Sequence, residues 1–421
     1  MSANVFGPLT KAFGRIGLLS FGGPAAQIAL MHRVIVEEKK WLDERTYLNA
    51  LSFCMLLPGP EAMQLATYVG WKRAGILGGL LSGLLFVLPG AFVIAVLALS
   101  YSIFGARPEA QAVLIGIQAT VIMIVLQALY RLSKKSLRST GLWAVALLSF
   151  CAIFLFDLPF PVILILAAIY GAMAHGTLPA TDTDNPASLP FSFRQTGFWL
   201  VLWLAPLAVL WAMDQTLLFQ LGTFFAKLAV VTFGGAYAVL AYMAQEVVTI
   251  RGWLSPEQMV DALGLAETTP GPLILVTQFV GMVTGYEHAG VGFALIAGLL
   301  TLWMTFVPCF LWIFTFAPHL DRLLARPRLQ GALSAISAAV VGVILNLSIW
   351  FALHVFFEDV QSHSFGIVSV TWPVLSSVSL PTLLLSALAG LALFWRHLSV
   401  LTTLVLTVIA GLGLYHFGVN G

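Results

Sequence analysis

Charged residues are scarce in this chain of 421 residues: Asp, Glu, Lys and Arg make up 9% of it, whereas hydrophobic residues make up 60%. A water-soluble domain carries about 25% charged residues, so this composition excludes an ordinary globule in water. Four intervals hold no Asp, Glu, Lys, Arg or His: those between Arg73 and Arg107, Gln195 and Met213, His288 and His319, and His363 and Arg396. Because a membrane helix needs about 20 apolar residues, these intervals predict an integral membrane protein.

The sequence also lacks the motifs of most enzymes and nucleic-acid-binding proteins. Cys54, Cys151 and Cys309 are isolated in apolar surroundings, which favours packing over a metal or redox role. The eight histidines show no ligand spacing, so no metal site is expected. There is no phosphate-binding loop, dinucleotide fingerprint or nucleophile elbow, and a net charge of +2 without a basic tail gives no sign of a nucleic-acid partner. We therefore expect no catalytic residues and no cofactor.

Apolar stretches of helical length follow one another along nearly the whole chain, which predicts an all-α, polytopic membrane protein of about 12–13 helices. The polar stretch from His175 to Gln195 predicts a linker. No apolar run with a small-residue cleavage site follows Lys11 and Arg15, so the first helix is expected to be retained. The stretches are 13–31, 46–70, 75–104, 110–130, 140–156, 158–174, 197–213, 218–243, 258–281, 289–317, 329–355, 372–395 and 398–416.

The second half of the chain repeats the first. Residues 13–60 align without a gap with residues 225–272, at a constant offset of 212. The shared motifs are Phe21-Gly22-Gly23 with Phe233-Gly234-Gly235, Trp41-Leu42 with Trp253-Leu254, and Pro58-Gly59-Pro60 with Pro270-Gly271-Pro272. Small residues then recur every fourth position in both halves, a spacing that lets membrane helices pack closely. They are Gly75, Gly79 and Gly83, and Gly290, Ala294 and Gly298.

This repetition predicts a first membrane repeat at 1–175, a linker and connecting helix at 176–213, and a second membrane repeat at 214–421. Seven segments separate equivalent points, so the two repeats are inverted if every segment crosses, an arrangement common in transporters. With a cytoplasmic N-terminus, the basic loops 131–138 and 322–328 obey the positive-inside rule. The charged segment Arg33 to Arg45 does not, so either it is an interfacial helix or one interrupted helix is re-entrant.

Helices are expected to break at both Pro-Gly-Pro motifs, because proline removes a backbone donor and clashes with the preceding turn. The helix that begins after each break would point amides and the positive end of its dipole into the membrane interior, which suits an anion. A plain proline kink is the alternative, but two copies at equivalent positions favour a substrate site. The paired glycines Gly22-Gly23 and Gly234-Gly235 predict a second pair of breaks, with close helix packing as the alternative.

Four charged residues stand close to these motifs. Arg15 and Lys227 occupy equivalent positions inside predicted helices, seven residues before the first glycine of each Phe-Gly-Gly motif, so cation and glycine share a helix face. A charge at such depth is costly, and we expect both to contact an anion unless they snorkel to the interface. Glu61 and Glu267 flank the Pro-Gly-Pro breaks and are candidates for proton coupling, although the helix dipole alone accounts for Glu61.

These motifs resemble the chromate ion transporter family. The resemblance covers nearly the whole chain and is to the long, two-domain members. It implies chromate export from the cytoplasm by a secondary mechanism, with halves of opposite topology. Ala236 stands where the first half has Pro24, and Val34 where an acid often stands, so the halves need not be equivalent in function. The resemblance rests on Phe21-Gly22-Gly23-Pro24, Lys40-Trp41-Leu42-Asp43-Glu44, Leu56-Leu57-Pro58-Gly59-Pro60-Glu61, Leu65-Ala66-Thr67-Tyr68-Val69-Gly70-Trp71 and their partial return in the second half.

The resulting expectation is a chromate exporter driven by the proton motive force, multi-pass in the bacterial inner membrane, with an oxyanion site between the halves. A transporter of sulfate or another tetrahedral oxyanion, and a passive anion channel, are the alternatives. An intramembrane hydrolase would need a catalytic dyad at membrane depth, and none is found. The expected partners are the oxyanion and the lipid bilayer, and a homodimer is left open.

Overall fold

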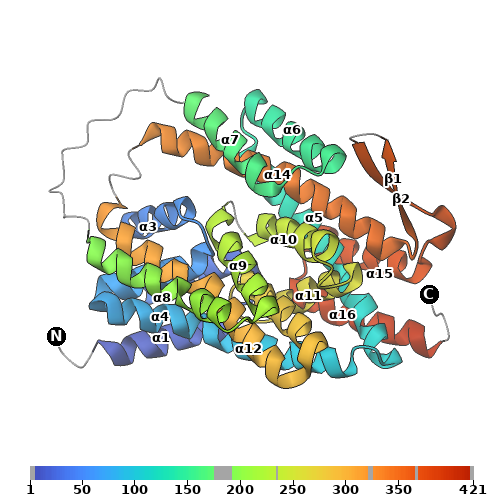
Figure 1. Cartoon of the computed structure of the whole chain (residues 1–421), viewed down its shortest axis with the longest axis horizontal. Coiled ribbons are helices and arrows are strands. Elements are labelled where there is room, and N and C mark those ends of the chain that lie inside the picture. The colour runs from blue at the N-terminus through green and yellow to red at the C-terminus, as the bar shows by residue number, and fades with distance from the viewer. Residues whose placement is uncertain (1–4, 175–191, 234–235, 321–325, 366–367, 418–421) are drawn as a thin grey trace. The chain divides into compact units, whose positions relative to one another are not determined.

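The computed structural model describes residues 5–174, 192–233, 236–320, 326–365 and 368–417 (Figure 1). Most of the predicted linker at 175–195 lies outside these residues. The first half and the connecting helix comprise α1 Phe6–Leu19, α2 Gly23–His32, the π-helix η1 Arg33–Glu38, α3 Glu44–Leu56, α4 Glu61–Phe104, α5 Pro108–Ser136, α6 Thr140–Phe156, α7 Phe160–Ala174 and α8 Phe193–Ala212. The second half comprises α9 Thr216–Val231, α10 Ala236–Ala244, the π-helix η2 Gln245–Ile250, α11 Pro256–Glu267, the short 3₁₀ turns η3 Leu273–Leu275, η4 Ala317–His319 and η5 Leu375–Ser377, α12 Val276–Phe316, α14 Pro327–Phe356, β1 Val360–Phe365, β2 Val368–Pro373, α15 Leu380–Gly390, η6 Leu391–Trp395 and α16 Val400–His416.

The predicted all-α membrane fold is confirmed. Within the described residues, five helical segments are long and apolar enough to cross a membrane, and six shorter apolar helices accompany them. The one departure is the antiparallel hairpin of β1 and β2, in which Val360 pairs with Pro373 and Phe365 with Val368. Its β-branched and aromatic residues favour a strand, and the sequence reading had included only its last two residues in an apolar stretch.

Two compact units make up the fold, and each takes helices from both halves of the sequence. The first contains α1, α2, α3, most of α4, α8, α9 and α12, and the second contains α5, α6, α7, α10, α11, α14, α15 and α16. The compact units are therefore not the repeats expected at 1–175 and 214–421. That division remains a prediction about repeated sequence.

Local structure in the second half follows that of the first, bond by bond. The π-helices η1 and η2 lie 212 residues apart at both ends. After each π-helix, the backbone amide of the equivalent tryptophan donates a hydrogen bond to a carbonyl of that π-helix. Trp41 donates to the Ile35 carbonyl at 2.9 Å, and Trp253 donates to the Val247 carbonyl at 2.8 Å. The same residues that the sequence aligns thus adopt the same turn.

In the first unit, α4 and α12 are each bent into a hairpin. Ala74-Gly75 and Ala289-Gly290 leave helical geometry, and the two glycines have positive φ angles of 64° and 76°. The two arms of α4 then pack closely, because a Cβ on Gly83 would lie 2.6 Å from Thr67 Oγ1. In α12 a Cβ on Gly298 would meet Met282. The predicted role of the small residues in close packing is confirmed at these positions.

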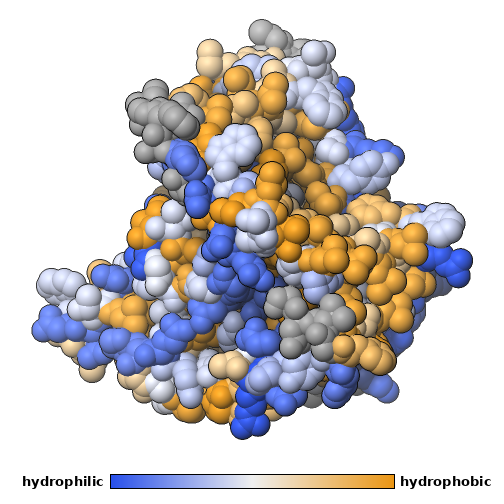
Figure 2. All heavy atoms as spheres, turned by 90° about the vertical axis from the view of Figure 1, so that its right-hand side faces the viewer, coloured by the Kyte–Doolittle hydropathy of each residue, from blue (hydrophilic) through white to orange (hydrophobic). Residues whose placement is uncertain are grey.

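The outer surface of these helices is apolar. Phe92 on α4 and Leu299 on α12 are 72% and 66% exposed, and Figure 2 shows broad hydrophobic areas on the face that it displays. The connecting helix α8 buries only Trp199 and Trp203, and the Trp203 indole donates to the Met304 carbonyl at 3.0 Å. A surface of this kind is stable against lipid and unstable in water.

Candidate oxyanion site at the helix breaks

The Pro-Gly-Pro motifs interrupt their helices completely, as predicted. Helix α3 ends at Leu56 and α4 begins at Glu61, while α11 ends at Glu267 and the helical turn η3 begins only at Leu273. The central glycines have φ angles of +116° at Gly59 and +90° at Gly271, a backbone shape that L side chains rarely adopt. A continuous helix with a proline kink is therefore not what these residues form.

Each interruption is hydrogen-bonded to the opposite half of the sequence. The Gly59 amide donates to the Thr232 carbonyl at 2.9 Å, and the Gly271 amide donates to the Ser20 carbonyl, also at 2.9 Å. Ser20 and Thr232 are themselves 212 residues apart, as are Gly59 and Gly271. Both carbonyls follow the ends of α1 and α9, where the helices have just stopped. The four residues, Ser20, Gly59, Thr232 and Gly271, form what we call the reciprocal crossing.

The amides of Gly59 and Gly271 are thus occupied by backbone carbonyls. The next amides along the chain make no backbone hydrogen bond among the described residues. They are those of Ala62 and Met63 at the start of α4, and of Leu273 and Ile274 after the second motif. The first amides of any helix lack partners within it and carry the positive end of its dipole. The prediction of an anion site at these breaks therefore concerns the amides of the first helical turn and not those of the glycines.

Three buried glutamines hold carbonyls in the same unit. Gln27 Nε2 donates to the Gly271 carbonyl at 2.6 Å, and Gln64 Nε2 donates to the Pro58 carbonyl at 2.6 Å. Gln278 Nε2 donates to the Ala91 carbonyl at 3.0 Å. The side-chain oxygen of each is buried and has no partner among the described residues. Gln64 and Gln278 follow the two Pro-Gly-Pro motifs closely in sequence. Gln27 was missed, although a lone amide four residues after Gly23 in an apolar helix was a usable signal.

The Phe-Gly-Gly break exists in the first half. Gly22 and Gly23 have φ angles of +86° and +77°, and they separate α1 from α2. In the second half Gly234 and Gly235 lie outside the described residues, and α10 begins just after them at Ala236.

The two predicted cations lie at exposed positions. The Arg15 side chain is 52% exposed and its guanidinium lies 2.9 Å from a carboxylate oxygen of Glu38 in η1. Lys227 is exposed at the equivalent position of α9, where Ile250 replaces the acid that pairs with Arg15. The structure does not bring either cation into the buried crossing, and their contact with an anion remains a prediction.

The two predicted carboxylates differ in burial. Glu61 is half-buried in the first turn of α4, where the helix dipole stabilises a negative charge. Glu267 is only 7% exposed and accepts a hydrogen bond from the Tyr237 hydroxyl at 2.7 Å. A buried carboxylate with a neutral donor is costly in its charged form, which suits a group that gains and loses a proton.

One ionisable cluster escaped the sequence reading. His32 at the end of α2 lies 2.7 Å from Glu44 and 3.2 Å from Glu37. The hydrogen bond to Glu44, together with the charges of both carboxylates, raises the pKa of His32 against the smaller lowering effect of burial. The acids and the histidine were visible in the charged segment, but their contact depends on the turn between η1 and α3.

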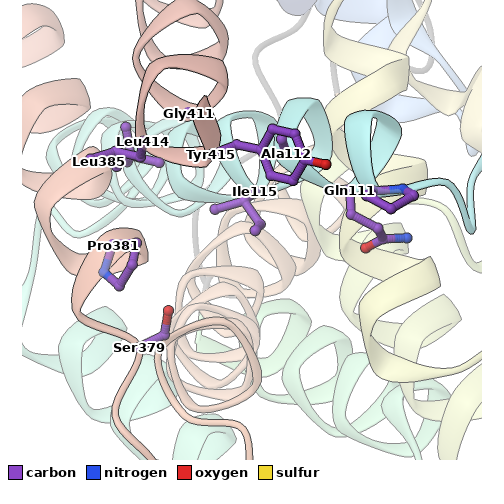
Figure 3. Close-up of a pocket in the computed structure, with 10 residues that line it drawn as sticks. Gln111, Ala112, Ile115, Ser379, Pro381, Leu385, Gly411, Leu414 and Tyr415 are labelled. Carbon is purple, nitrogen blue, oxygen red and sulfur yellow. The ribbon is translucent and has the colours of Figure 1, made fainter. Parts of the chain in front are cut away.

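A separate pocket in the second unit is a poor match for an oxyanion. It has a volume of about 250 Å³ and is lined mainly by apolar side chains of α5, α15 and α16, such as Ile115, Leu385 and Leu414 (Figure 3). Its amide, Gln111, is already bonded to the Gly105 carbonyl at 2.5 Å. The lining offers no cation, so we do not place the substrate there.

Comparison with known proteins identifies the chain's relatives. The family model described as chromate transporter matches residues 8–172 and 219–414. A chromate transport protein of Cupriavidus metallidurans is 33% identical over 80% of each chain, and a probable chromate transport protein of Synechococcus elongatus is 29% identical over 92% of this chain and 95% of its own. The uncharacterized transporter YwrB of Bacillus subtilis is 32% identical over 37% of this chain and 78% of its own. No solved structure matches.

Proposed function

Because the chain belongs to the chromate transporter family, we propose that this membrane transport protein is a secondary transporter that exports chromate from the cytoplasm, driven by the proton motive force. Relatives named as chromate transport proteins cover four-fifths or more of the chain, which supports chromate as the cargo. The location that goes with this role is the bacterial inner membrane, crossed many times.

The reciprocal crossing is the observation that carries the mechanism. The Gly59 amide reaches Thr232 just as the Gly271 amide reaches Ser20, and such an exchange of equivalent contacts is the mark of a two-fold relationship. Seven segments separate equivalent residues in sequence, so the axis would lie in the membrane plane and the halves would be inverted. Inverted halves can rock about a central site that opens to each side in turn.

The substrate site would lie at this crossing. The amides of Ala62, Met63, Leu273 and Ile274 are the donors, and Pro58, Gly59 and Pro60 with Pro270, Gly271 and Pro272 set their direction. A helix end offers about half a positive charge, so two ends compensate roughly one charge of a dianion. The buried glutamine oxygens are acceptors and would take an O–H from a protonated oxyanion or from water.

Side-chain cations would supply the remaining charge. Arg15 grips two oxygens of a tetrahedral anion where lysine offers only a point charge, and its exposed pairing with Glu38 costs little to exchange. Lys227 would act from the equivalent helix, because it precedes Gly234 and Gly235 in sequence at the same spacing at which Arg15 precedes Gly22 and Gly23. Glu61 and Glu267 are the proton-coupling candidates that this mechanism includes.

Flux into inside-out membrane vesicles tests the proposal. Vesicles containing the chain should accumulate chromate when acidified inside relative to outside, and vesicles lacking it should not. Sulfate supplied in place of chromate separates a chromate carrier from a general tetrahedral-oxyanion carrier. Flux that follows the voltage alone and is indifferent to the pH gradient would instead indicate a passive channel. Crosslinking and mass measurement in detergent decide whether a homodimer forms.

A further inference from the structure

Helix α11 is a short helix that is buried from Met259 to its end, and it carries a second buried carboxylate besides Glu267. All residues from Met259 to Glu267 are buried, and Asp261 is only 3% exposed. A helix surrounded by protein in this way normally carries apolar side chains alone. The presence of Asp261 therefore needs an explanation.

Two neutral donors hold Asp261, one on each oxygen. The Tyr101 hydroxyl donates to Oδ2 at 2.9 Å, and Gln118 Nε2 on α5 donates to Oδ1 at 2.8 Å. Among the described residues no lysine, arginine or histidine pairs with this carboxylate. Glu257, one turn earlier on α11, carries a negative charge as well and so offers Asp261 no ion pair.

This arrangement satisfies the carboxyl group in both protonation states. The charged form accepts from both donors. When a proton binds Oδ2, the Tyr101 hydroxyl can turn to accept from it, because a phenol is both donor and acceptor, while Gln118 continues to donate to Oδ1. Both oxygens of Asp261 thus keep a hydrogen-bond partner in either state, which lowers the usual penalty that locks a buried carboxyl into one form.

Close packing of α11 against α5 sets the distance between Asp261 and Gln118. Gly264, one turn after Asp261, faces α5 so closely that a Cβ would collide with Ile117 and approach Val121 to 3.0 Å. Asp261 and Gly264 lie on the same face of α11. A movement of α11 along or away from α5 would therefore separate Asp261 from Gln118 directly.

We propose that Asp261, held by Tyr101 and Gln118, is a proton-binding site of the transport cycle. The carboxylate takes a proton from the aqueous phase and loses its charge, and it returns the proton when α11 and α5 separate. No bond to the substrate forms. This inference rests on the proposed function for its place in a cycle, whereas proton binding itself does not depend on chromate.

Two measurements on reconstituted full-length protein test it. Infrared difference spectroscopy between acidic and alkaline buffer should show the carbonyl band of a protonated carboxyl group, and this band should be lost in Asp261→Asn. Tyr101→Phe removes a donor to the charged form, so the band should titrate with its midpoint at higher pH. A band unchanged in Asp261→Asn, or an unchanged midpoint in Tyr101→Phe, overturns the proposal whatever the protein transports.

Transport separates this proposal from the proposed function. Asp261→Asn vesicles should retain exchange of labelled for unlabelled chromate. The factor by which a pH gradient accelerates their chromate flux should fall at least about tenfold. Glu267→Gln is measured in parallel, and full retention of the pH response in Asp261→Asn overturns the role in coupling. If wild-type vesicles move no chromate, the proposed function fails, and the infrared result still decides whether Asp261 binds a proton.

Discussion

The amide of Gly59 donates a hydrogen bond to the carbonyl of Thr232, 173 residues further along the chain, and the equivalent bond from Gly271 to Ser20 has the same length. The two bonds tie the interruption of each half to the end of the first helix of the other. They turn two sequence motifs that are distant in the chain into one local structure, and every prediction about the substrate site depends on it.

Replacing Gly59 or Gly271 with alanine should impair transport through this crossing. A Cβ on Gly59 would lie 2.8 Å from Gln64 Nε2 and 3.1 Å from Cys309 Sγ, and the positive φ angles add backbone strain of about 1–3 kcal/mol. Gly252→Ala is the matched control, because Gly252 also has a positive φ angle but open space around its Cβ position. Chromate flux at equal protein level is the measurement. Equal flux in all three variants would remove the crossing from the mechanism.

The charge of Arg15 should matter more than its ion pair. We expect Arg15→Gln to reduce chromate flux by about tenfold or more, equivalent to about 1.4 kcal/mol, and Arg15→Lys to reduce it less. Lys227→Arg should likewise be tolerated better than Lys227→Gln. Glu38→Gln is the informative control, since it leaves the guanidinium without its 2.9 Å partner. If Glu38→Gln and Arg15→Gln lose the same activity, Arg15 serves only the pair.

The His32 cluster should make stability depend on pH. The neighbouring carboxylates of Glu44 and Glu37 raise the pKa of His32 above its ordinary value of 6.5. Protonated histidine thus favours the folded state. This contribution is complete below about pH 6.5 and is lost as the pH rises through the raised pKa.

Thermal unfolding in detergent measures this effect. Between about pH 6 and about pH 8 the melting temperature of the parent should fall more than that of His32→Gln. Because the His32 ring is partly solvated, the corresponding difference in unfolding free energy should not exceed about 1 kcal/mol. His416→Gln is the control, since its ring lies tilted against that of Tyr415 and the described residues place no carboxylate within ion-pair distance of it. Identical pH profiles for the parent and His32→Gln would contradict the prediction.

Inverted halves place the ends of two equivalent helices on opposite sides of the membrane. Helices α5 and α14 both begin with proline and both follow a hairpin helix, so Lys135 near the end of α5 corresponds to the chain just after α14. In a cysteine-free background, Lys135→Cys and Arg326→Cys should resist an impermeant thiol reagent applied to intact cells. Gln361→Cys, on the exposed hairpin strand β1, should react. Reaction of Lys135→Cys together with Gln361→Cys would exclude inversion.

The sequence was a good guide to where the helices break and a poor guide to what the breaks contact. Proline chemistry is local, so Pro58-Gly59-Pro60 could be assigned from the motif alone. The partner of the Gly59 amide is a carbonyl in the other half, and no local pattern marks a carbonyl as an acceptor. For the same reason the occupied glycine amides and the pairing of Arg15 with Glu38 were not foreseen.

Burial explains the residues that were missed. Asp261 and Gln27 are polar residues in largely apolar helices, and in a sequence they look like any solvent-facing position. Only packing shows that each is enclosed and held by partners more than 140 residues away, Gln118 for Asp261 and Gly271 for Gln27. By contrast, the close packing at Gly83 and Gly298 was indicated by small-residue spacing, because close approach of two helix arms requires small residues at periodic positions.

The crossing also imposes an order on biogenesis. The chain is inserted from its N-terminus, so α3 and the start of α4 enter the bilayer before residue 232 has been synthesised. Until then the Gly59 amide faces an apolar medium with no acceptor, a state that costs several kcal/mol. The ribosome must therefore deliver more than half of the polypeptide before the Pro58-Gly59-Pro60 interruption can reach its final structure, and a chain truncated ahead of α9 would stay a substrate for membrane quality control.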